Sequence, residues 1–192
     1  MNKTRLETFS DGVMAIIITI MVLELKTPLT ESWPDIRHML FEIGTYMLSF
    51  AFVATFWGNH HHMLHTVKKV NAKIIWSNML VLFCLSLIPF ATRWMGDKNF
   101  DSMTVAAYGL ILLLSSVSFA FLQRSIISQG LLSPKLLETL RKQDSKWMIT
   151  AVLYLASIPL AFVQVTISII ILVGMAIWWI IPNKDIEKAM SE

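Results

Sequence analysis

Long apolar runs set the strongest limit on what this chain can fold into. A run of about 20 mostly apolar residues is long enough to cross the hydrocarbon core of a bilayer as a helix. Apolar residues make up 55% of the 192 residues and charged residues only 15%, whereas charged residues make up about 25% of ordinary soluble domains. We therefore predict an all-α, polytopic membrane protein in which residues 1–192 form a single transmembrane domain.

The apolar runs divide into six predicted helices. The first four cover roughly residues 5–25, 37–65, 72–95 and 102–127. The last run, 147–181, is too long for one crossing, and it contains Pro159 followed by three polar residues. We predict two short helices there, 147–163 and 166–181, joined by a tight turn. In the third helix, Pro89 is expected to cause a kink near the outer end.

The placement of basic residues favours six crossings over five. Loops on the cytoplasmic side of a membrane protein are enriched in Lys and Arg. Six crossings leave only four of the 16 basic residues on the side opposite the termini, namely Lys26, Arg37, Arg93 and Lys98. Five crossings would move Lys184 and Lys188 to that side and give a weaker division of 10 to 6. Both termini are therefore predicted to be cytoplasmic.

Composition and charge also argue against several other classes of protein. The net charge of +3 is small and the basic residues lie in short loops, so no nucleic-acid partner is expected. Cys84 is the only cysteine, which rules out an intrachain disulfide framework. Glu7 and Asp11 interrupt the first apolar run, and a cleaved signal peptide is therefore not expected.

The predicted first helix is unusually polar at its start, where residues 5–12 read RLETFSDG. A charged side chain at the centre of a membrane helix costs roughly 2.5–3.5 kcal/mol on insertion scales. Asp11 lies deeper than Arg5 and therefore needs an explanation. Two interpretations are open at this point. Either Ser10 or Asp11 caps the start of a helix by accepting backbone N–H groups, or both belong to a polar cluster inside the bundle.

The end of the predicted second helix offers partners for such a cluster, since residues 56–65 read FWGNHHHMLH. Trp57, His61 and His65 are spaced four residues apart and share one helix face. Histidines at this spacing can bind a metal, but no HExxH motif or cysteine partner accompanies them, and no metal is expected. The alternatives are a hydrogen-bond network with Asp11 and Ser10, or solvated histidines at a helix end.

The remainder of the first helix carries an apolar stripe. Helical spacing places the following residues on one face: Arg5, Phe9, Gly12, Ile16, Thr19, Ile20 and Leu23. A row of bulky apolar residues is typical of lipid contact or helix packing, and an ion path is normally marked by polar groups. The chain also lacks a TVGYG-type filter. Spacing alone therefore assigns no function to the stripe.

The residues quoted so far resemble a known family. The motif Arg5-x3-Phe9-Ser10-Asp11-Gly12, followed by Ala15-Ile16-x2-Thr19, is similar to the first-helix signature of the transmembrane protein 175 family. The resemblance extends to Trp57, to the run of histidines 60–62, and to the segment from Asn78 to Thr92, and it is weaker after that. Eukaryotic members are endosomal and lysosomal potassium channels. The length suits the short bacterial members, which have six helices and assemble as homotetramers in the cell membrane.

The resemblance implies a role for each of these residues. The first helix of each subunit would line a central pore in which Ile16 forms the main hydrophobic constriction, with Ile20 and Leu23 as further apolar layers. Thr19 would contribute a weak to moderate preference for K⁺, the permeant ion, and no cofactor is implied. The residues that match a supporting polar network, which does not touch the ion, are Arg5, Ser10, Asp11, Trp57, His61 and Asn78.

Other functions remain as alternatives. A secondary transporter would bind its substrate near the membrane midplane and usually contains repeats and broken helices. A proton-conducting leak channel would make use of the histidines. A membrane enzyme would need converging catalytic groups or metal ligands, for which the histidine run is the one candidate, and enzyme activity is not expected.

Overall fold

The computed structural model describes residues 2–28 and 30–180, and this part of the chain is built from helices. The helices are α1 (Lys3–Leu23), α2 (Trp33–His65), α3 (Ala72–Ser86), α4 (Ile88–Asp97), α5 (Ser102–Ile127), α6 (Pro134–Val163) and α7 (Val165–Ile180). α3 and α4 together make one candidate membrane span. Residue 181 of the predicted last helix, and Lys184 and Lys188 of the charge argument, lie outside the described residues.

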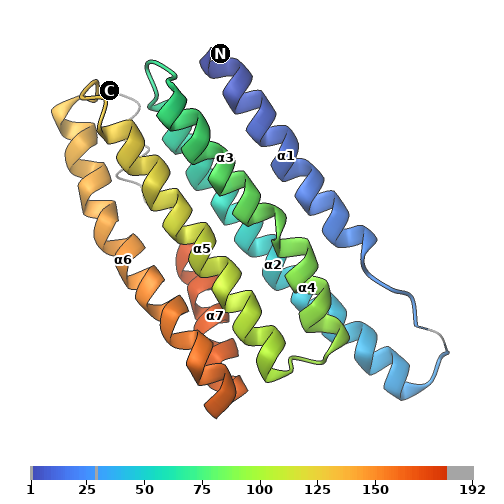
Figure 1. Cartoon of the computed structure of the whole chain (residues 1–192). Coiled ribbons are helices and arrows are strands. Elements are labelled where there is room, and N and C mark those ends of the chain that lie inside the picture. Colours follow the sequence, from blue (N-terminus) through green and yellow to red (C-terminus); the bar gives the residue numbers. More distant parts are fainter. Residues whose placement is uncertain (1, 29, 181–192) are drawn as a thin grey trace.

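Among the described residues, five segments are long and apolar enough to cross a membrane: α1, α2, α3 together with α4, α5 and α6. α7 is a shorter apolar helix. The prediction of an all-α, multi-pass membrane protein is confirmed. α1 lies at one edge of the bundle (Figure 1) and packs against α2, α3 and α4. α5 packs against α3, α4, α6 and α7. The amino terminus lies at the same end of the bundle as the α2–α3 and α5–α6 connections.

Buried hydroxyl groups join the helices at the centre of the bundle. The Thr92 hydroxyl of α4 donates to Ser49 Oγ of α2 over 2.6 Å, and Ser49 Oγ lies 2.8 Å from the Tyr108 hydroxyl of α5. All three side chains are buried. Between apolar helices such polar contacts fix which faces meet, because a slipped register would leave the hydroxyl groups without partners.

Two predicted interruptions of helix geometry are confirmed. α3 ends at Ser86 and α4 starts at Ile88, so that Leu87 separates them and Pro89 lies in the first turn of α4. Proline lacks a backbone N–H and its ring clashes with the carbonyl of the preceding turn, which explains the break. The tight turn between the last two helices is formed by Gln164, which has an extended backbone.

α6 begins 13 residues earlier than the predicted range 147–163, at Pro134. Ser133 caps it by accepting from the backbone N–H of Leu136 over 3.3 Å, and a Glu138–Lys142 ion pair of 2.9 Å lies along its first turns. A hydropathy pattern misses this part of the helix because its residues are polar, although a capping serine followed by proline is a typical start signal.

A close approach between α5 and α6 depends on Gly109. A Cβ added there would lie 2.8 Å from Ser157 Oγ, which is closer than real Cβ atoms come. Small residues let membrane helices approach each other in this way. We expect Gly109→Val to lower the unfolding free energy by about 1–3 kcal/mol, as overpacking does, and to lower the melting temperature of the purified protein.

The matched control for this prediction is Gly44→Val. Gly44 lies in α2, and a Cβ added there would meet nothing within 4 Å. The same glycine-to-valine change should therefore affect the melting temperature much less. Equal losses for the two variants would contradict the close α5–α6 approach.

Candidate functional site

The two faces of α1 have opposite environments. The residues on one face are buried against the rest of the subunit: Leu6, Ser10, Met14, Ile17 and Met21. The predicted stripe, from Arg5 to Leu23, occupies the other face and is exposed along its whole length. Ile16 is 59% exposed and Leu23 is 77% exposed. Within one subunit the stripe therefore has no packing role, and its apolar side chains require lipid or another copy of the chain as a neighbour.

Thr19 is the polar member of the outer part of this stripe. Its hydroxyl donates to the backbone carbonyl of Ala15 over 2.9 Å. A hydroxyl group has one proton and two lone pairs. Because the proton is used inside the helix, the lone pairs of Thr19 Oγ1 are left for the exposed face, where they can accept from water or contact a cation.

An apolar groove lies beside the stripe, between α1 and the α3–α4 span. Its volume is about 760 Å³, and Ile16, Ile20, Pro89 and Phe90 are among the residues that line it. Ile16 and Ile20 belong to both, so the stripe and the groove form one largely apolar face of the chain.

A buried hydrogen-bond chain holds the opposite face of α1. Ser10 Oγ donates to the carbonyl of Leu6 over 2.8 Å and accepts from Asn78 Nδ2 over 2.9 Å. Asn78 Oδ1 in turn lies 2.6 Å from His60 Nε2. Ser10, Asn78 and His60 are each at most 1% exposed. This chain connects α1, α3 and α2 through side chains that have no access to water.

Asp11 takes part in a separate contact nearer the surface. It accepts from the Trp57 indole N–H over 2.9 Å, and the Trp57 ring lies 5.7 Å from the His61 ring. The alternative that Ser10 or Asp11 caps a helix start is wrong, because α1 starts at Lys3 and Asn2 is the residue that caps it. The exposed Arg5 guanidinium makes no hydrogen bond or ion pair with the residues that the structure describes.

One residue of the predicted network is replaced by its neighbour. The sequence placed His61 in the network, but in the structure His60 contacts Asn78 while His61 lies on the exposed face beside Trp57. The reason is the helix period, since successive residues point about 100° apart. His60 follows the buried Phe56 by four residues, and this spacing is the signal that would have found it.

Comparison with known proteins places this chain in a family. Residues 5–89 match the family model described as endosomal/lysosomal potassium channel TMEM175. The chain is 43% identical, over its whole length and that of the relative, to a protein of Chryseobacterium sp. (strain P1-3) that is named a potassium channel. A potassium channel of Streptomyces collinus is 26% identical over 88% of this chain and 87% of its own length.

A solved structure of the same family is also similar to this chain. It is the crystal structure of a lysosomal potassium-selective channel TMEM175 homologue from Chamaesiphon minutus, which superposes with a TM-score of 0.80 at 25% identity. The match covers 92% of this chain and 95% of that one. This chain belongs to the TMEM175 family.

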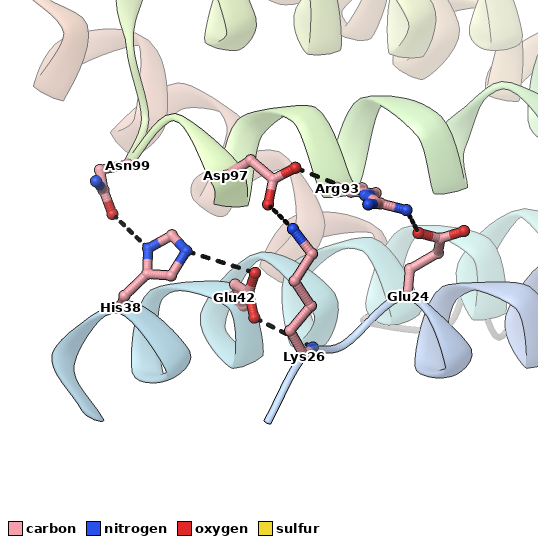
Figure 2. Close-up of polar contacts among 7 residues, drawn as sticks. All are labelled: Glu24, Lys26, His38, Glu42, Arg93, Asp97 and Asn99. Carbon is pink, nitrogen blue, oxygen red and sulfur yellow. Dashed lines mark hydrogen bonds and ion pairs between the residues drawn. The ribbon is translucent and has the colours of Figure 1, made fainter. Parts of the chain in front are cut away.

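A second polar cluster of this TMEM175-family chain (Figure 2) joins the end of α1 to α4, at the end of the bundle opposite the amino terminus (Figure 1). Glu24, which directly follows α1, pairs with Arg93 of α4. Lys26 Nζ lies 2.8 Å from Asp97 Oδ1, also on α4. These pairs connect the end of α1 to the α3–α4 span. In the sequence Lys26 and Arg93 are visible only as charges, because their partners lie 71 and 69 residues away along the chain.

The buried chain at Asn78 gives a testable prediction for stability. Asn78→Leu would leave Ser10 and His60 without their buried partner, at about 1–3 kcal/mol for each unsatisfied group. We expect a clearly lower melting temperature of the purified protein in detergent. Ser86→Ala is the control, because Ser86 lies in the same helix and its hydroxyl bonds only the carbonyl of Phe83. Equal melting temperatures would show that the chain does not hold α1 in place.

Proposed function

We propose that this chain is a subunit of a potassium-permeable, weakly to moderately K⁺-selective cation channel. Four copies assemble as a homotetramer in the plasma membrane of a bacterial cell, with both termini in the cytoplasm, and α1 of each copy lines a central pore. One observation carries the proposal: α1 exposes Ile16, Thr19, Ile20 and Leu23 while its other face is buried. Membership of a family of channels supports it.

The exposed apolar face requires an assembly of several copies, and the number four is what the family resemblance implies. An exposed stripe on one helix provides only one wall of a pathway, so several copies are required to enclose it. In the proposed assembly the stripe of each copy faces the central axis. The apolar groove between α1 and the α3–α4 span then lies at the boundary with the next copy.

The gate is a ring of isoleucine side chains. Four copies of Ile16 around an axis form a constriction that excludes water, and hydrophobic constrictions close ion pathways by dewetting. Ile20 and Leu23, one and two turns further along α1, form additional apolar layers. Opening requires these side chains to move apart, for example by a displacement of the end of α1 that carries Ile20 and Leu23.

The preference for K⁺ is assigned to Thr19. Four Thr19 oxygens with outward lone pairs replace part of the water shell of an ion, which favours the cation that loses its water more easily. One ring of hydroxyls offers fewer ligands than stacked rings of carbonyls, and the preference is therefore modest. Ser10, Asn78 and His60 support α1 from its buried side, and Trp57 supports it through Asp11. Arg5 and His61, which match the family's network, are exposed, and none of these residues contacts the ion in this proposal. No cofactor, metal or enzymatic step is part of this proposal.

The gate is tested by the substitution Ile16→Asn. A polar ring hydrates the constriction, and we expect K⁺ flux into vesicles containing the purified protein to rise by about tenfold or more, as a barrier lower by about 1.4 kcal/mol would produce. Ile170→Asn is the matched control, because Ile170 lies on the exposed face of α7. Unchanged flux in Ile16→Asn would remove this residue from the gate, and saturable exchange instead of electrogenic leak would favour a secondary transporter.

The assignment of K⁺ preference to Thr19 is tested with two variants, one that removes the Thr19 hydroxyl and one that retains it. We expect Thr19→Ala to shift the reversal potential under a K⁺/Na⁺ gradient to near zero, since the constriction then has no oxygen ligand. Thr19→Ser keeps the hydroxyl and should keep most of the preference. If Thr19→Ala selects K⁺ as well as the unmodified protein does, Thr19 is not part of the filter.

A further inference from the structure

The side chains of His38, Glu42 and Asp97 lie near one another in the polar cluster of Figure 2. His38 and Glu42 are one turn apart on α2, and Asp97 is the last residue of α4. One ligand atom from each side chain lies within 4.8 Å of the others. Within residues 2–28 and 30–180, these are the three possible metal-ligating side chains whose ligand atoms lie this close together.

The hydrogen bond of His38 leaves one ring nitrogen available. His38 Nδ1 lies 3.1 Å from Asn99 Oδ1, which can only accept, so Nδ1 carries the proton. In the neutral ring, Nε2 then has a lone pair that points toward Glu42 Oε1 at 3.6 Å. Two acceptors that face each other repel unless a proton or a metal cation lies between them, and a cation that binds here takes the place of that proton. Metal-ligating histidines are typically fixed in this way, by a hydrogen bond from the other nitrogen to an oxygen.

The Glu42 carboxylate lacks a strong partner of its own. Its side chain is only 8% exposed, and its Oε2 accepts from the backbone N–H of Lys26 over 3.3 Å. A buried carboxylate without a close cation is unfavourable, because the lost hydration is not compensated. An ion between Glu42 and His38 would supply that compensation.

An open cleft leads to His38 and Glu42. It has a volume of about 600 Å³, and Lys26, Thr27, His38 and Glu42 are among the residues that line it. A small hydrated cation can therefore reach the buried carboxylate from solution. Among the residues drawn in Figure 2, the charged side chains other than His38 are three carboxylates and two cations, which leaves an excess of one negative charge: Glu24, Glu42, Asp97, Lys26 and Arg93.

We propose that His38, Glu42 and Asp97 bind a divalent transition-metal cation of the Zn²⁺ class. One imidazole nitrogen and two carboxylate oxygens are ligands that Zn²⁺ prefers, at about 2.0–2.2 Å, with the fourth position left for water. Such distances place the ligand atoms about 3.4 Å apart. The pair His38 Nε2 and Glu42 Oε1 meets this at 3.6 Å, and rotation of the Asp97 side chain completes the site.

Lys26 competes with the metal for Asp97. Its ammonium group now occupies Asp97 Oδ1 at 2.8 Å, but the lysine side chain is 53% exposed and can turn into water. Metal binding would break the Lys26–Asp97 ion pair, which joins the α1–α2 connection to α4. In its place, the metal would join α2 to α4. Removal of the lysine charge should therefore strengthen metal binding, whereas the loss of a ligand should weaken it.

The site is tested by titrating Zn²⁺ into the tag-free, full-length protein in detergent and measuring the heat of binding by calorimetry. We expect one site per chain, an affinity at least tenfold weaker in His38→Gln and in Glu42→Gln, and a tighter site in Lys26→Gln. Ca²⁺, which prefers oxygen ligands, should bind much more weakly. The control is His65→Gln, which removes an exposed histidine at the other end of α2 and should leave the affinity unchanged.

Several outcomes would overturn the assignment. Equal Zn²⁺ affinity of the unmodified protein and His38→Gln, with circular dichroism confirming that both are folded, would exclude the histidine as a ligand. Loss of binding in His65→Gln would move the ion to the histidines near the amino-terminal end. Equal Zn²⁺ affinity of the unmodified protein and Asp97→Asn would exclude Asp97 as a ligand. These measurements follow metal binding and not ion flux, so their result is separate from that of the proposed channel.

Discussion

The buried hydrogen bonds from Ser10 to Asn78 and from Asn78 to His60 fix the rotation of α1 about its own axis. Rotation by one residue, about 100°, would move Ser10 away from Asn78 and leave two polar groups unsatisfied between apolar helices. Because this face of α1 is fixed against α3 and α2, the opposite face is fixed as well, and Ile16 and Leu23 must point out of the subunit. The polar start of the helix thus determines the direction of its apolar end.

The other end of α1 is held by a different kind of interaction. Glu24 pairs with Arg93, and Lys26 with Asp97, at positions partly exposed to water. Exposed ion pairs contribute little to stability, commonly less than about 1 kcal/mol, and they are easily exchanged for water or for an ion. The helix therefore has one firmly held end and one adjustable end. In the proposed channel this arrangement lets the apolar layers move while the network near Asn78 stays intact, and the proposed metal site lies at the adjustable end.

The sequence predicted the number of apolar segments and the break near Pro89 because both depend on local composition and on the chemistry of proline. It did not predict the first half of α6, whose polar residues carry no hydropathy signal. It named His61 but left open which of the adjacent histidines 60–62 joins the network, since a run of three histidines gives no indication of which one faces inward until the buried neighbours are known. The cluster of His38, Glu42 and Asp97 could not be predicted either, because it joins segments about 60 residues apart through tertiary packing. The role of the stripe came from the family signature, as periodicity alone is equally typical of lipid contact.

The central claim is that the exposed face of α1 borders the ion path, and thiol modification during current recording tests it most directly. The single native thiol, Cys84, is buried and can be replaced by serine. In that background a charged, membrane-impermeant thiol reagent should change the K⁺ current of Leu23→Cys in planar bilayers and leave that of Phe162→Cys unchanged, since Phe162 is exposed on α6, away from α1. An unaltered current from Leu23→Cys protein that mass spectrometry shows to be fully modified would contradict the account.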